Sequence, residues 1–132
     1  MVGSFMENIP LVLSGCVVGI ILFQSAVTAP AVFTVLSGQD ASLFLRKIFP
    51  LFFLLIAFLS TTNAIIVILN NQAELIPVPL VSVILALFAY ILIPMTNRSR
   101  DEADESRFKL LHRMSVCLTL IILGCNAAVV IL

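Results

Sequence analysis

Four long runs of apolar residues, separated by three short polar stretches, dominate the pattern of this chain. The runs cover residues of about 10–36, 48–69, 77–95 and 108–132. An α-helix needs roughly 20 apolar residues to cross the hydrocarbon core of a bilayer, and each run is close to that length or longer. The pattern predicts an all-α fold, an integral membrane four-helix bundle that forms one transmembrane domain over residues 1–132.

Proline and glycine predict where the first two spans begin, bend and end. Pro10 suits the first turn of a helix, where its missing N–H has no intrahelical partner. Pro30 and Pro50 lie inside apolar runs, so we expect each to kink or interrupt its helix. We expect Gly38 to end the first helix and Asp40 to cap the second.

Composition supports the membrane assignment. Hydrophobic residues make up 61% of the chain and charged residues 11%, whereas soluble domains are roughly half apolar and a quarter charged. A chain of this size has too small a core to hide so much apolar surface, so we expect the lipid bilayer to cover it. The net charge is zero, which gives no general attraction to nucleic acid.

The distribution of positive charge predicts the topology. All seven Lys and Arg residues lie in or beside the first and third links, and none lies near the termini or in the second link. By the positive-inside rule, loops 37–47 and 96–107 are cytoplasmic and both chain ends are outside. We expect a multi-pass protein of the bacterial inner (plasma) membrane with an N-out/C-out arrangement.

Four residues are candidates for helix packing. Gly15 and Gly19 form a GxxxG pair, which lets a neighbouring backbone approach closely. Asn63 and Asn126 need hydrogen-bond partners inside the bilayer. Their depths, counted from the cytoplasmic side, are similar, so we expect them to pair across the second and fourth spans.

Two polar arcs run along the first and last spans. On a regular helix the first arc contains Ser14, Gln24, Ser25 and Thr28, and the second contains His112, Ser115, Thr119 and Asn126. Such arcs either form hydrogen bonds between helices or line a path for a ligand or water. Both interpretations stay open at this point.

The candidate site is the cytoplasmic end of the bundle. Six residues lie near this end when depth is counted along the spans from the cytoplasmic side. They are two prolines, two phenylalanines, the chain's one histidine and a serine: Pro30, Phe33, Phe49, Pro50, His112 and Ser115. Non-helical backbone at membrane depth is tolerated mainly where it is buried in protein or lines a wet cavity.

His112 has three interpretations. It holds the cytoplasmic ends together by bonding to link 37–47 or to Ser115, it transfers protons, or it is a ligand of a metal or of haem, the latter with a methionine such as Met95 or Met114. A single His without Cys or carboxylate neighbours is a poor metal site. We assign no metal ligands and no catalytic residues, because no second group with a defined role accompanies the histidine.

Several motifs, taken together, resemble a known family. They are Ala29-Pro30 with Phe33, the KIFP sequence of residues 47–50, Pro94, and Phe108 with His112 and Ser115. In this order they resemble the DUF4149, or TMEM205-like, family of small four-helix membrane proteins, which is grouped with CopD-like proteins and a haem-binding oxidase. The resemblance implies four spans and no established activity. Arg113 stands where the family often has glycine, and a single histidine argues against carrying over a haem function.

The function we expect is non-catalytic. The leading hypothesis is an accessory or interaction subunit that packs against other membrane subunits or a second copy of itself. The alternative is a small-molecule or metal-ion handling protein with a site around His112, and a further alternative is a haem-binding membrane oxidoreductase.

Overall fold

The structure, a computed structural model, describes residues 2–132 and the side chains from Phe5 onward. Its elements are all helical: α1 (Val2–Phe23), the π-helical turn η1 (Gln24–Thr28), α2 (Ala29–Val35), α3 (Gly38–Leu69), the 3-10 turn η2 (Ala73–Leu75), α4 (Pro77–Asp101) and α5 (Glu105–Ile131). Four helical segments are long and apolar enough to cross a membrane. The predicted all-α four-helix fold is confirmed.

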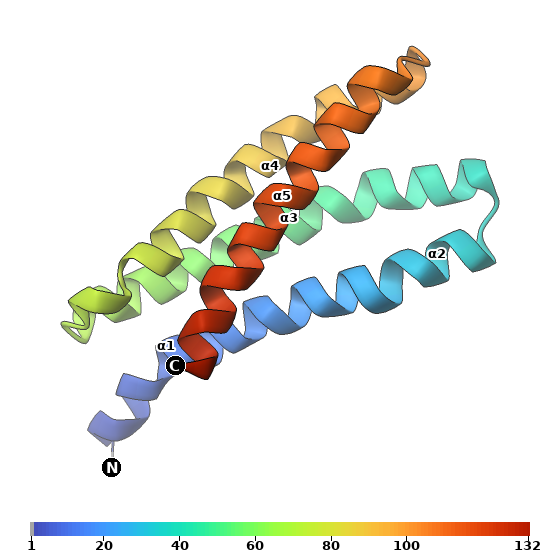
Figure 1. The fold of residues 1–132 in the computed structure, drawn as a ribbon. Coiled ribbons are helices and arrows are strands. Elements are labelled where there is room, and N and C mark those ends of the chain that lie inside the picture. Colours follow the sequence, from blue (N-terminus) through green and yellow to red (C-terminus); the bar gives the residue numbers. More distant parts are fainter. Residues whose placement is uncertain (1) are drawn as a thin grey trace.

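The helices run up and down, so that both chain ends and η2 lie at one end of the bundle (Figure 1). The α2–α3 and α4–α5 turns lie at the opposite end, which is called the arginine end below because Arg46, Arg98 and Arg100 are there. Helix α3 packs on α4, and α5 packs on α4 and α1. At the arginine end α2 stays with α3 and diverges from α5 (Figure 1).

The first predicted link is far shorter than residues 37–47. Helix α3 begins at Gly38 and continues through Pro50, so the expected interruption there was wrong, and so was a helix stop at Gly38. Ser37 is the N-cap, and its hydroxyl accepts a hydrogen bond from the backbone N–H of Asp40 at 3.4 Å. A serine cap fixes the helix start ahead of the basic residues, and a bundle tolerates an internal proline where neighbours compensate for the lost hydrogen bond.

The third predicted link, 96–107, is also mostly helical. Only three residues separate Asp101, the end of α4, from Glu105, the start of α5. Ala103 adopts a φ of 54°, and the N–H of Asp104 bonds to the carbonyl of Ser99 at 2.9 Å. This is the Schellman arrangement that commonly ends helices. The mixed charges of this stretch therefore lie on helical turns rather than in an extended loop.

Pro10 lies inside α1 instead of starting it. An internal proline leaves the carbonyl four residues earlier without its helical donor. Here the side-chain amide of Asn70 donates to that carbonyl, Met6 O, at 2.7 Å. Gln72 donates in the same way to Glu7 O at 3.2 Å. The link between α3 and α4 thus supplies donors to the helix turn that the proline leaves incomplete.

Small residues form the face that α4 turns toward the bundle. Pro79, Ser82, Ala86 and Ala89 recur at helical spacing and are buried. Small side chains allow two helix backbones to approach closely. The core joins this face to larger side chains of α1, α3 and α5: Val17, Ile21, Phe52, Phe53, Ile56, Ala57 and Ile122.

The outer surface of the helices is apolar. Phe58 of α3 and Ile84 of α4 are 67% and 65% exposed. Only 11% of the apolar window in the last span is buried within the protein. Exposed apolar area on this scale is typical of helices that face lipid.

The two membrane-depth asparagines have separate partners, so the expected pairing between them was wrong. Asn63 donates to Pro10 O at 3.3 Å and to Ser14 Oγ at 3.2 Å, which links α3 to α1. Asn126 donates to Ser82 Oγ at 2.8 Å, which links α5 to α4. Each asparagine therefore joins a neighbouring pair of helices.

The two glycines of the GxxxG pair have different surroundings. A Cβ added at Gly15 would lie 4.0 Å from Val130 of α5, whereas one at Gly19 would meet no described atom within 4 Å. Gly15 therefore faces α5 at contact distance. A role for this face in binding another subunit stays a prediction.

Candidate functional site

A cavity of about 590 Å³ lies at the arginine end, among the end of α1, η1, α2, α3, α4 and α5. Its wall is mainly apolar and includes Ile21, Leu45, Phe49, Phe53, Ile93 and Leu123. Its polar lining comprises Gln24, Ser25, Ser42, Arg46, Thr96, Asn97, Arg100, His112, Ser115 and Thr119. The divergence of α2 from α5 opens one side of the cavity, where exposed Leu22, Phe33, Val116 and Leu120 form the edge.

The π-helical turn η1 forms one wall. The N–H of Ala29 bonds to the carbonyl of Gln24, five residues earlier. Pro30 follows at once and has no N–H to continue the regular ladder, so the wider turn accommodates it. The side chain of Gln24 is 9% exposed, and its Nε2 has no hydrogen-bond partner among the described residues. Gln24 is one of the residues that line the cavity, whereas its Nε2 atom is itself buried.

Three phenylalanines of α3 form the apolar floor. The rings of Phe49 and Phe53 stack with centroids 6.4 Å apart. Phe52 meets Phe53 edge to face at 5.0 Å. Paired rings of this kind hold one another in place, so this part of the wall is rigid and apolar.

Three contacting side chains, those of Arg100, Phe108 and His112, lie at the polar mouth of the cavity, which is the part of its lining nearest the α4–α5 turn. The guanidinium carbon of Arg100 lies 4.8 Å from the ring centroid of Phe108. The Phe108 ring is parallel to the His112 imidazole, with an interplanar angle of 6° and centroids 6.0 Å apart. A guanidinium that rests its face on an aromatic ring keeps its N–H donors at the edge. The stack therefore fixes a cation at the mouth with its donors still available.

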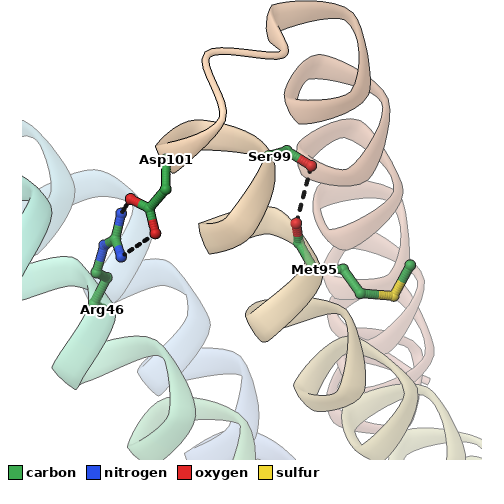
Figure 2. Close-up of polar contacts among 4 residues, drawn as sticks. All are labelled: Arg46, Met95, Ser99 and Asp101. Atoms are coloured by element: carbon green, nitrogen blue, oxygen red, sulfur yellow. Dashed lines mark hydrogen bonds and ion pairs between the residues drawn. The ribbon is translucent and has the colours of Figure 1, made fainter.

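The second arginine of the mouth is neutralised. Arg46 of α3 makes a two-point ion pair with Asp101 at the end of α4, and the bond from Nη1 to Oδ2 is 3.1 Å long (Figure 2). On the neighbouring turn, Ser99 Oγ donates to Met95 O at 2.9 Å (Figure 2). The pair ties α3 to α4 and leaves Arg100 as the cation of the mouth without a carboxylate partner in the described part of the chain.

Four of the six residues expected to cluster do line this cavity: Phe33, Phe49, His112 and Ser115. Pro30 and Pro50 do not. Pro50 instead borders a smaller hollow of about 230 Å³ with Tyr90 and Pro94. The prolines shape the helices that form the cavity without contributing to its lining.

The polar arcs divide between packing and lining. Gln24 and Ser25 line the cavity, whereas Ser14 bonds to Asn63. His112, Ser115 and Thr119 also line it, whereas Asn126 turns toward α4. Part of each arc therefore packs against another helix and part lines the cavity, and a role in binding a ligand or water stays a prediction.

The contact of His112 differs from the expected hydrogen bond. Its imidazole stacks on Phe108, and within the described residues no hydrogen bond joins it to Ser115 or to residues 37–47. The neighbouring hydroxyl of Thr119 bonds to Ser115 O at 2.8 Å instead. His112 joins the stack at the mouth.

The residues around His112 do not fit a haem with histidine and methionine ligands. Neither Met95 nor Met114 lines the cavity to which His112 belongs. Among the described residues no group of three or more His, Cys, Asp or Glu side chains could hold a metal ion. The arrangement instead offers hydrogen-bond donors and a cation beside an apolar wall.

Sequence analysis missed Arg46, Asn97 and Arg100 as site residues. It counted the two arginines only as topological signals. Their spacing gave a signal in retrospect: on helix α4, Asn97 and Arg100 are three residues apart and continue the face of Ile93. The contact of Arg100 with Phe108 depends on the tight α4–α5 turn.

Comparison with known proteins adds one match. The model of a family described as "Domain of unknown function (DUF4149)" matches residues 12–105, which is more than half of the chain. No curated protein and no solved structure matches. The match fits the resemblance in the sequence motifs, and the CopD-like grouping stays a prediction.

Proposed function

The chain belongs to the DUF4149 family, and we propose that this member is a multi-pass membrane protein that binds a small amphiphilic molecule without transforming it. The binding site is the cavity at the arginine end. This develops the small-molecule alternative of the sequence analysis. The leading expectation there, an accessory subunit, has no specific contact to support it.

The unpaired amide of Gln24 carries the proposal. A buried donor without a partner is costly, and in the bilayer core water is scarce. Such groups in native proteins call for an explanation, such as a bound molecule. Gln24 lines a cavity and its Nε2 is buried without a partner among the described residues. A rotation of the side-chain amide would bring this donor to an acceptor oxygen of a bound molecule whose apolar part covers the phenylalanine wall.

The lining favours binding over catalysis. Among the described lining residues the ionisable groups are Arg46, Arg100 and His112, and none is Asp or Glu. Acid–base chemistry on a bound molecule generally needs a second group with a defined role. His112 stacks on Phe108, an arrangement suited to positioning.

Blocking the cavity tests the proposal. Ser115 is half-buried and lines the cavity, so Ser115→Trp should fill it and exclude the bound molecule. We expect solvent extraction and mass spectrometry of the purified protein to recover an amphiphile from the wild type, and about tenfold less from the variant, which corresponds to about 1.4 kcal/mol.

Cys117→Trp is the matched control, because Cys117 lies on the same helix, is exposed and is outside the cavity. Equal recovery from both tryptophan variants, each with wild-type helicity, would contradict the proposal. Copurification of another membrane subunit in fixed stoichiometry would support the accessory role instead.

We propose further that the arginine end faces the cytoplasm of a bacterial inner membrane. The positive-inside rule supports this orientation. In spheroplasts of a variant without native cysteines, Ala73→Cys should react with an impermeant thiol label at once. Gln39→Cys, at the other end, should react only after permeabilisation. The reverse pattern would invert the topology.

A further inference from the structure

We propose that the bound molecule is an anionic glycerophospholipid, with its phosphate at Arg100 and an ester carbonyl at Gln24. This inference rests on the proposed function and specifies the ligand of the same site. It follows from three features: the charge of the mouth, the depth of the unpaired amide, and the open apolar side.

The mouth is selective for negative charge. The guanidinium of Arg100 lies over the Phe108 ring and makes no ion pair within the described residues, and its planar set of donors matches a phosphate in two-point geometry. Asn97 lies beside it on the lining and adds an amide donor. Arg46 is paired to Asp101, so Arg46, Asp101 and Arg100 together leave one net positive charge at the mouth. This charge fits a single anionic phosphate.

The depth of Gln24 suits an ester carbonyl. Counted back from the α2–α3 turn at about 1.5 Å per residue, Gln24 lies near the level of Phe49, about one helical turn below Arg46. The ester groups of a glycerophospholipid lie a few ångströms below its phosphate. After a rotation of the Gln24 amide toward the cavity, its Nε2, which has no partner among the described residues, would donate to an ester oxygen while Arg100 holds the phosphate.

The open side provides room for the acyl chains. The edge residues Leu22, Phe33 and Leu120 are apolar and exposed. An acyl chain that starts along Phe49 and Phe53 can leave the cavity past these edge residues, at the end of the bundle where α2 and α5 diverge (Figure 1). The cavity therefore needs to enclose only the headgroup region and the first part of a chain, and a lipid could enter sideways.

A tryptophan reporter tests the ligand. The chain has no native tryptophan, so Val116→Trp places a single fluorophore at the cavity edge. Ile84→Trp places one on the outer face of α4 as the matched control. Both are reconstituted in phosphatidylcholine vesicles containing small amounts of brominated phosphatidylglycerol or brominated phosphatidylcholine, whose bromines quench tryptophan.

We expect the anionic lipid to quench the cavity reporter at concentrations on the order of tenfold lower than the zwitterionic lipid. The outer reporter should not distinguish them. In the Val116→Trp background, Arg100→Gln should abolish the preference. Arg98→Gln should keep it, because Arg98 lies on the same turn of α4 but outside the cavity, paired with Glu102.

Two further variants separate the lipid contacts from general damage to the fold. Asp101→Asn releases Arg46 and should strengthen the preference for the anionic lipid. Gln24→Met should remove any preference for ester-linked over ether-linked brominated phosphatidylglycerol, because the ether lacks the carbonyl acceptor.

The outcomes distinguish the inference from the proposed function. If the cavity and outer reporters respond alike to every lipid, the cavity holds no lipid and the inference fails. The proposed function fails as well only if the wild type and Ser115→Trp also yield equal amounts of extracted amphiphile. If the cavity reporter is quenched more strongly but without headgroup preference, or Arg98→Gln matches Arg100→Gln, only the headgroup assignment is overturned. Displacement of the brominated lipid by inorganic phosphate alone would show a free-anion site and also overturn the lipid assignment.

Discussion

Replacing Ala86 with leucine should lower the free energy of unfolding by about 1–3 kcal/mol, the usual cost of forcing extra methylenes into a packed interior. Ala86 is fully buried, in the small-residue face of α4 and in contact with the core. A larger side chain there must push α4 away from its neighbours α3 and α5. The separation from α5 weakens the hydrogen bond from Asn126 to Ser82 on the same face. Denaturant titration in detergent micelles, followed by circular dichroism, measures the loss.

Ala128→Leu is the control for this substitution. Ala128 is exposed on α5, so the same added volume should change the unfolding free energy by less than about 0.5 kcal/mol. Equal destabilisation by the two variants would mean that the close approach of α3 and α4 does not depend on the small residues of α4.

Gln24→Met should have the opposite effect to Ala86→Leu. It should raise the free energy of unfolding of the lipid-free protein by about 1–3 kcal/mol. Methionine has nearly the same length and shape, but it carries no donor that needs a partner. A buried unsatisfied donor costs about that amount, and the Nε2 of Gln24 has no partner among the described residues. The same variant should retain less amphiphile, so stability and binding should move in opposite directions.

Gln39→Met is the matched control, because Gln39 is exposed on the first turn of α3. It should leave both the unfolding free energy and the recovered amphiphile unchanged. Destabilisation by Gln24→Met in delipidated protein would show instead that the amide is satisfied within the bundle, and would remove the observation on which the proposed function rests.

The sequence predicted the bundle, and the end that it favoured for a site is the end at which the structure has the cavity. Span length and apolarity decide whether a helix can cross a bilayer, and both are local properties of the chain. The seven basic residues lie at the same end of the bundle as Phe33, Phe49 and His112 because a chain that crosses up and down brings alternate links together. These results needed only the pattern of residues and the antiparallel order.

The sequence did not predict the contacts within that end. The chain has two faces of small residues, one on α1 that includes Gly19 and one on α4 that includes Ala86. The neighbouring helices decide which face is buried in the bundle, and it is the face of Ala86. The partners of Asn63 depend on a proline that lies inside a helix instead of at its start. The stack of Arg100 on Phe108 depends on a three-residue turn hidden in a stretch of mixed charge.

The π-helical turn η1 also determines the phase of the helix that follows it. A wide turn takes up one residue more than a regular turn, so everything after it is rotated by roughly 100° relative to an uninterrupted helix. With this rotation α2 presents Val32 to Ala41 and Leu45 of α3 and places Phe33 at the edge of the cavity. The length of the segment Gln24–Thr28, as much as the identity of its residues, therefore decides which side chains line the cavity. Two chains with identical residues in α2 but η1 segments of different length would have differently lined cavities.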